Sequence, residues 1–167
     1  MKPFFHILAG LGTGLLLSVL LSCTKVPEPA GMPEPAAGQK EQPKEITMPK
    51  QIQISISGKT IPVKIEDNVA TRALVAALQK ASVTYEADDY GGFEKVGALG
   101  RSLPASDTQI TTQPGDVILY SGNQIVLFYG SNSWSYTRIG KMEYGSLDGL
   151  KSFLKAGEGK ISVTLSL

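Results

Sequence analysis

The side chains of this chain that could do chemistry gather in two stretches, one on each side of a strongly apolar segment. The first is "DDYGGFEKVGALGRSLP", residues 88–104, and the second follows "GNQIVLFYG", over residues 129–138. Arginine beside aromatic rings makes a surface that stacks on planar groups and grips a carbonyl or carboxylate. The candidate ligand-binding residues are therefore Tyr90, Phe93, Arg101, Tyr129, Trp134, Tyr136 and Arg138.

Two interpretations of these candidates stay open. Tyr136 and Arg138 are two residues apart, so on a strand they share one face. In the structural alternative, Arg101 pairs with a nearby acid and the tyrosines cap the end of a barrel. The glycines of residues 88–104 permit bends and close backbone approach, so we interpret this stretch as a long connection across the barrel wall. We expect it to form a binding rim, with no catalytic residue.

Acidic side chains offer a weaker signal. Asp88, Asp89 and Glu94 lie close together and could act as paired carboxylates or as ligands of a hard cation. We favour a solvated acidic turn. Asp116, in "PGDVI", is expected to fix a turn before a strand.

Several chemistries lack their usual parts. The chain has one histidine, His6, and one cysteine, Cys23, and both lie in the N-terminal segment. Neither a Ser-His-Asp or Cys-His arrangement nor a zinc site of His and Cys is then available to the folded part. No GxxxxGK phosphate loop occurs, and no GxGxxG follows a strand. From these missing motifs we expect no metal and no cofactor. The net charge is +1 with no basic patch, so we expect no nucleic-acid partner.

The N-terminus has the features of a secretory signal: Lys2, an apolar run over residues 7–21, and small residues before a cleavage site. The ending "LLSC" resembles the lipobox of bacterial lipoproteins. That resemblance implies cleavage after residue 22 and acylation of Cys23, which would anchor the chain to a lipid bilayer. We therefore expect a cell-envelope protein, in the outer membrane of a Gram-negative host or otherwise on the outer face of the cytoplasmic membrane.

Residues 23–49 are expected to form a tether. Six of the ten prolines lie here, the segment contains the near repeat "PEPA…PEPA", and large apolar residues are almost absent. Such a segment buries too little surface to offset the entropy of ordering it. Proline-rich linkers extend by about 3.1 Å per residue, so the tether could hold a domain tens of Å from a membrane.

Residues 50–167 are expected to form one mainly β domain. "QIQISIS" and "TIPVKIE" alternate as two strands joined at Gly58 and Lys59. A second hairpin, "DVILYS" and "QIVLFYG", has near-continuous apolar runs, which indicate burial on both faces. Helices are expected after the first hairpin, capped by Asp67 or Asn68, and after Ser146. Seven or eight short strands with two helices favour a closed barrel, since closure removes exposed edges.

The order of these elements resembles the bacterial cyclophilin-like domain family over residues 50–167. "PGDVILYSGNQIVLFYG", "LFYG" and the segment "RSLP" carry the resemblance. It implies a closed eight-stranded cyclophilin-like barrel with two capping helices. It implies little about activity, because one fold hosts many functions.

True cyclophilins are peptidyl-prolyl isomerases that use an arginine in "FHR", a "QGGD" segment, a tryptophan and a histidine. This chain has neither "FHR" nor "QGGD". Arg101 and Arg138 are the available arginines to stabilise a twisted amide. We therefore expect a binding module for a peptide or small ligand more than an enzyme, with a divergent prolyl isomerase as the alternative.

Overall fold

The computed structural model describes residues 47–167. The expected signal peptide, and the tether up to residue 46, lie outside these residues, so the boundaries at residues 22 and 49 stay predictions. Within the described part, neither helix has the length and apolar character needed to cross a bilayer.

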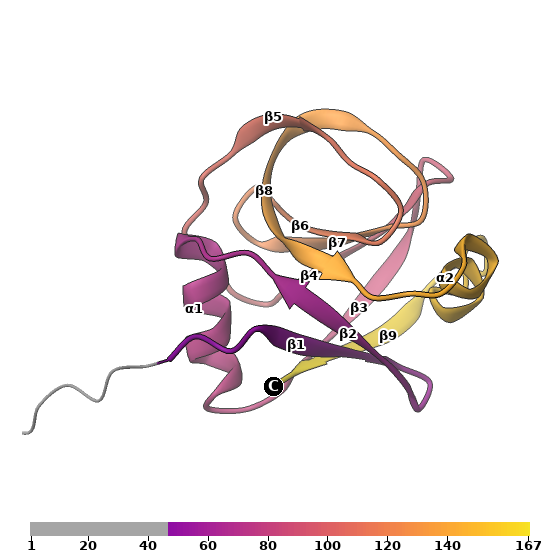
Figure 1. The fold of residues 1–167 in the computed structure, drawn as a ribbon. Coiled ribbons are helices and arrows are strands. Elements are labelled where there is room, and N and C mark those ends of the chain that lie inside the picture. Colours follow the sequence, from indigo (N-terminus) through magenta and orange to yellow (C-terminus); the bar gives the residue numbers. More distant parts are fainter. Residues whose placement is uncertain (1–46) are drawn as a thin grey trace, which may run out of the picture. The chain divides into compact units, whose positions relative to one another are not determined.

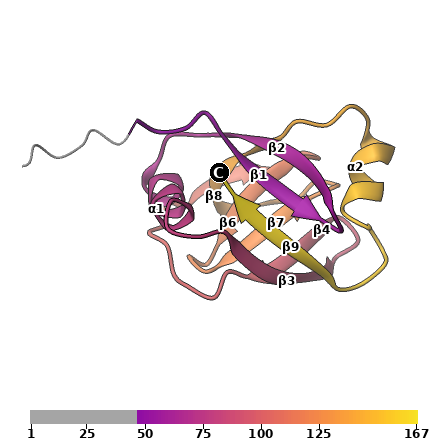
Figure 2. The same ribbon diagram turned by 90° about the horizontal axis from the view of Figure 1, so that it is seen from below.

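The described part is built mainly from antiparallel strands. The strands are β1 (Gln51–Ile56), β2 (Lys59–Ile65), β3 (Val83–Tyr90), β4 (Glu94–Ala98), β5 (Thr108–Thr111), β6 (Asp116–Tyr120), β7 (Gln124–Phe128), β8 (Ser133–Met142) and β9 (Ile161–Ser166). The helices are α1 (Val69–Leu78) and α2 (Leu147–Phe153), which lie on opposite sides of the strands (Figures 1 and 2).

Eight of the strands close into a barrel. The order is β2-β1-β9-β3-β4-β7-β6-β8, and β8 pairs back with β2, with Ile65 opposite Gly140. The ninth strand, β5, pairs with the N-terminal part of β8, where Ile110 lies opposite Trp134. The prediction of a closed eight-stranded barrel with two helices is confirmed.

The first hairpin turns one residue earlier than the sequence predicts. Ile56 pairs with Lys59, so the two turn residues are Ser57 and Gly58. Their φ angles are 49° and 76°, as a type I′ turn requires at both positions. Lys59 is therefore the first residue of β2.

Both helices begin at polar caps. Asn68, one of the two expected caps, accepts a hydrogen bond at Oδ1 from the Thr71 N–H, at 3.0 Å. Ser146 does the same for the Gly149 N–H, at 3.1 Å. Each side chain satisfies a donor that the first turn of the helix leaves without a partner.

The stretch interpreted as a long connection is a hairpin, and that interpretation was wrong. Residues 88–90 end β3 and residues 94–98 form β4, with Tyr90 opposite Glu94. Gly91 and Gly92 make the turn, with φ angles of 63° and 75°. The sequence did not predict β4 because Glu94 and Lys95 are charged, and charged residues are expected at exposed positions. In the structure both are buried.

The wall formed by β6 and β7 is buried on both faces, as the apolar runs predicted. Residues such as Val117 and Leu127 belong to the core inside the barrel. Their neighbours on the opposite face form a second cluster: Ile118, Val126, Phe128 and Tyr136, with Phe93, Val96, Ile110 and Tyr120 against it. β5 and the first half of β8 arch over this outer face (Figure 1). We call β5 and residues 133–136 of β8 the arch.

Candidate functional site

A cavity of about 470 Å³ lies on this outer face of the barrel wall. It is lined by Tyr90, Glu94, Val96, Tyr120, Gln124, Val126, Asn132, Trp134 and Tyr136. A volume of this size is in the range that holds small organic ligands. The cavity is the candidate functional site.

Strand alternation explains why these residues meet. Glu94 and Val96 lie two apart on β4, and Gln124 and Val126 lie two apart on β7, so each pair points to one face. The register places Val96 directly opposite Val126. β8 begins in the arch, at residues 133–136, before the residues that pair with β6. This N-terminal part of β8 brings Trp134 to the cavity.

Aromatic rings pack together beneath and beside the cavity. Tyr136 makes edge-to-face contacts with Tyr120, at 5.8 Å between ring centroids, and with Phe128, at 5.9 Å. Phe93 stacks on Phe128 at 6.3 Å. The Asn132 side chain donates a hydrogen bond from Nδ2 to the Tyr136 hydroxyl at 2.9 Å. These contacts hold the rings in place before any ligand binds.

Two large aromatic side chains form an exposed rim. Tyr90 is 66% exposed and Trp134 is 56% exposed, although both line the cavity. Exposed aromatic side chains at the mouth of a cavity are characteristic of binding surfaces, because their burial by a ligand is favourable. Tyr90 comes from the end of β3 and Trp134 from the arch.

Glu94 is the unusual polar group of the cavity. It is 5% exposed, and its Oε2 atom is buried without a hydrogen-bond partner among residues 47–167. Burial raises the pKa of Glu94 to about 7, because removal from water disfavours the carboxylate. The prediction of a solvated acidic turn was therefore wrong for Glu94, which a strand turns into the cavity.

Asp89 also departs from the solvated turn. Its carboxylate contacts Lys95 Nζ at 2.8 Å, accepts the Gly159 N–H at 2.8 Å and accepts the Tyr129 hydroxyl at 3.0 Å. Partial burial opposes its ionisation, but bonds from Lys95, the backbone of Gly157 and Gly159, and Tyr129 outweigh it and lower the pKa of Asp89 to about 2. Lys95 is fully buried and also donates to the Gly159 carbonyl.

Tyr129 therefore belongs to this ionic cluster and not to the cavity lining. Burial, together with its bond to Asp89, raises the pKa of Tyr129 to about 12. Its ring is 5% exposed and packs in the barrel interior. Alternation along the chain explains the placement, since Tyr129 follows Phe128, which points to the outer face.

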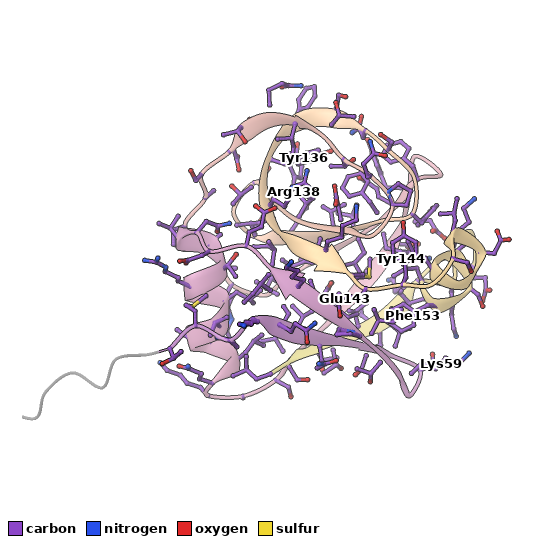
Figure 3. All side chains as sticks on the ribbon, viewed as in Figure 1. Lys59, Tyr136, Arg138, Glu143, Tyr144 and Phe153 are labelled. Carbon is purple, nitrogen blue, oxygen red and sulfur yellow. The ribbon has the colours of Figure 1, made fainter. Side chains whose placement is uncertain are left out.

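Arg138 shares a strand face of β8 with Tyr136, as predicted (both are labelled in Figure 3), but it is not among the residues that line the cavity. Nη1 contacts Oδ2 of the fully buried Asp116, and Nε lies 3.5 Å from Glu66. Asp116 also accepts the Gln113 N–H at 2.9 Å, which fixes the turn before β6 as expected.

The sequence candidates thus divide into three groups. Tyr90, Trp134 and Tyr136 line the cavity, and Phe93 packs beneath it. Tyr129 and Arg138 serve buried ion clusters elsewhere. Arg101 is exposed, lies outside the cavity lining and takes part in no ion pair found among residues 47–167.

Sequence reasoning missed several lining residues. Glu94 was considered only as part of an acidic turn, and Tyr120, Gln124 and Asn132 were not considered. Recognising "EKVGA" as a strand would have placed Glu94 and Val96 on one face. The alternation in "DVILY" would likewise have placed Tyr120 on the face of Ile118.

The described residues hold no group of three or more His, Cys, Asp or Glu side chains placed to bind a metal ion. Glu94 is the one carboxylate of the cavity lining. The arrangement suits stacking, hydrogen bonding and a single charge contact with a ligand.

Two solved structures show distant similarity. One is the solution structure of a hypothetical protein from Archaeoglobus fulgidus, with 16% identity, 73% of this chain and 97% of that chain covered, and a TM-score of 0.49. The other is McbB in complex with tryptophan, with 14% identity, 70% of this chain and 44% of that chain covered, and a TM-score of 0.49. Identities this low say nothing about ligands. No curated protein matches the chain significantly.

The family comparison is stronger than these structural similarities. The sequence pattern of the cyclophilin-like family matches residues 54–166, which span almost the whole described part and more than half of the chain. The closed barrel with two helices agrees with that match. The chain belongs to the cyclophilin-like family.

Proposed function

We propose that this protein is a lipid-anchored envelope protein whose cyclophilin-like domain binds a small ligand or peptide in the cavity under the arch. The observation that carries the proposal is the cavity itself. It combines an exposed aromatic rim, Tyr90 and Trp134, with the buried and unpartnered carboxylate of Glu94. A few placed polar groups in an otherwise apolar and aromatic concavity favour ligand recognition.

Binding is a better proposal than prolyl isomerisation. An isomerase of the cyclophilin type needs an arginine beside the prolyl nitrogen, and none of the described residues that line the cavity is an arginine. The guanidinium of Arg138 is engaged by Asp116, and Arg101 is exposed outside the cavity. The groups that remain offer contacts to a ligand but no such electrophile.

The single tryptophan of the chain, Trp134, lies in the cavity and reports its occupancy directly. The test is a fluorescence titration of the full chain in detergent, with capped proline peptides and a panel of small molecules of different charge. NMR exchange spectra of the same peptides measure cis–trans interconversion. Saturable fluorescence changes without faster exchange support the binding module. Faster exchange would replace it with the isomerase, and a panel without any response would refute binding in the cavity.

The membrane anchor is proposed from the sequence alone, and its test is separate. Cys23 is the only cysteine, so Cys23→Ser removes the one thiol that could be acylated. We expect the wild-type protein to incorporate labelled palmitate and to sediment with membranes in a bacterial host. The variant should lose the label. Label retained by Cys23→Ser would contradict the anchor.

A further inference from the structure

The only charged side chain among the nine residues that line the cavity is acidic. Glu94 is the only acid among the nine lining residues, and none of them is lysine or arginine. The nearest cation along the chain, Lys95, lies on the opposite face of β4 and pairs with Asp89. Arg138 pairs with Asp116. A bound anion would therefore meet a carboxylate without a compensating cation.

The aromatic lining adds to the same preference. Tyr90, Tyr120, Trp134 and Tyr136 all line the cavity, and the face of each ring carries a negative potential that attracts cations. Two of these rings, Tyr90 and Trp134, are more than half exposed and so have surface free for a ligand. Several aromatic rings around one carboxylate form a site that attracts an ammonium group.

Glu94 lacks the partner that such a group would supply. Its Oε2 atom is buried and accepts no hydrogen bond, and a buried polar atom left this way is costly. A ligand that brings positive charge to the carboxyl group removes much of this cost, since it favours the ionised form that burial disfavours.

Resting on the proposed function, we infer that the cavity selects ligands that carry an organic ammonium group, which contacts the Glu94 carboxylate and the surrounding aromatic rings. The group can belong to a small quaternary ammonium compound or to a lysine side chain of a peptide. The two sources share this chemistry and are separated by the choice of probe.

The preference has a consequence for pH. The titratable groups that line the cavity with Glu94 are Tyr90, Tyr120 and Tyr136, and Tyr129 is close enough to be influenced by it. Glu94, with a pKa of about 7, changes its charge between pH 6 and pH 8. A permanently charged ligand should therefore bind about tenfold more tightly at pH 8 than at pH 6. A neutral ligand that accepts a hydrogen bond from the protonated acid should show the reverse.

Trp134 fluorescence of the full chain in a non-ionic detergent measures this selectivity. The small-molecule probes are choline, a quaternary ammonium ion whose charge does not change with pH, and its uncharged isostere 3,3-dimethylbutan-1-ol. The peptide-like probes are Nα-acetyl-lysine amide and uncharged Nα-acetyl-norleucine amide. The variants are Glu94→Gln, which removes the charge at nearly constant shape, and the control Glu86→Gln on the exposed side of β3.

We expect a cationic probe to bind at least tenfold more tightly than its neutral partner at pH 8. Glu94→Gln should abolish that difference, and Glu86→Gln should keep it. Tyr90→Leu, at the exposed rim, should lower the affinity for the cationic probe several-fold without affecting folding. It is a second test if Glu94→Gln alters the fold. A response to choline alone identifies a small quaternary ammonium ligand, and a response to the lysine probe alone identifies a lysine side chain.

Equal affinity for charged and neutral partners, or tighter cation binding at pH 6, overturns the ammonium preference and leaves ligand binding in the cavity standing. A difference that survives in Glu94→Gln also overturns it. Absence of any response, to these probes and to the wider panel described above, overturns the binding function and the preference together.

Discussion

Glu94 and Lys95 are consecutive residues of β4, and their side chains are buried on opposite faces of the barrel wall. Lys95 is fully buried and reaches Asp89 at 2.8 Å, whereas the Oε2 atom of Glu94 has no partner. Two adjacent charges of opposite sign are thus separated by the alternation of a strand. Lys95 forms an ion pair, and Glu94 lines the cavity.

The Asp89–Lys95 pair should be essential for stability. Asp89→Asn leaves the buried ammonium of Lys95 without its counter-charge, which costs about 3–5 kcal/mol. Urea unfolding at pH 7 measures the loss. The matched control is Asp88→Asn, at an exposed neighbour, which should change the free energy of unfolding by less than about 0.5 kcal/mol. Equal effects of the two variants would contradict a specific role for Asp89.

Glu94 should make the protein less stable as the pH rises through neutrality. Its pKa is about 7 in the folded state against 4.5 without burial, so the folded state binds more protons over this interval. The stability gained from protonation is fully present below pH 4.5 and is lost as the pH rises through 7, by on the order of 3 kcal/mol. Urea unfolding between pH 5 and pH 8 measures the decline. Glu94→Gln should remove it, and a slope unchanged in the variant would assign the effect to another group.

Asp89 has the opposite dependence on pH. Its pKa falls from 3.8 to about 2 on folding, so its contribution is present above pH 3.8 and is lost as the pH falls through 2. Wild-type stability should decline over this acid range. In Asp89→Asn the decline should be smaller. An equally steep decline in both proteins would show that other carboxylates dominate acid unfolding.

Of the two candidate arginines, Arg138 should be needed for stability and Arg101 should not. Arg138→Ala removes a charged hydrogen bond from the buried Asp116, which keeps Lys141 at 3.4 Å, so we expect a loss of about 2–3 kcal/mol. Arg101→Ala, at an exposed position, should leave the free energy of unfolding unchanged. Thermal unfolding compares them. A folded and stable Arg138→Ala protein that loses ligand response would return Arg138 to the binding site.

Gly140 should be required to close the barrel. A Cβ atom there would lie 2.3 Å from the Lys64 carbonyl oxygen of β2, at the register position where β8 meets β2. Backbone crowding of this kind cannot be relieved by a rotamer change, so Gly140→Ala should cost about 3 kcal/mol. Gly145→Ala, with nothing within 4 Å, is the matched control. Similar denaturation midpoints for both variants would show that the strands separate without cost.

The sequence by itself determined the features that depend on neighbours along the chain. Alternation predicted β1 and β2, and near-continuous apolar runs predicted β6 and β7 and their burial on two faces. The polar caps Asn68 and Ser146 predicted the helix starts. The number of strands and the advantage of removing edges favoured closure. These inferences held because each is set by local periodicity or by composition.

Only the tertiary structure decided which side chains share the cavity. Tyr129 and Tyr136 look equivalent in the sequence, yet one supports the Asp89–Lys95 pair and the other lines the cavity, because strand register puts them on opposite faces of the wall. In the sequence Glu94 is one more charge in an acidic stretch, and only the folded chain buries it and removes its water. Burial, and the pKa that follows from it, depends on residues distant in the chain, so no local pattern could reveal it.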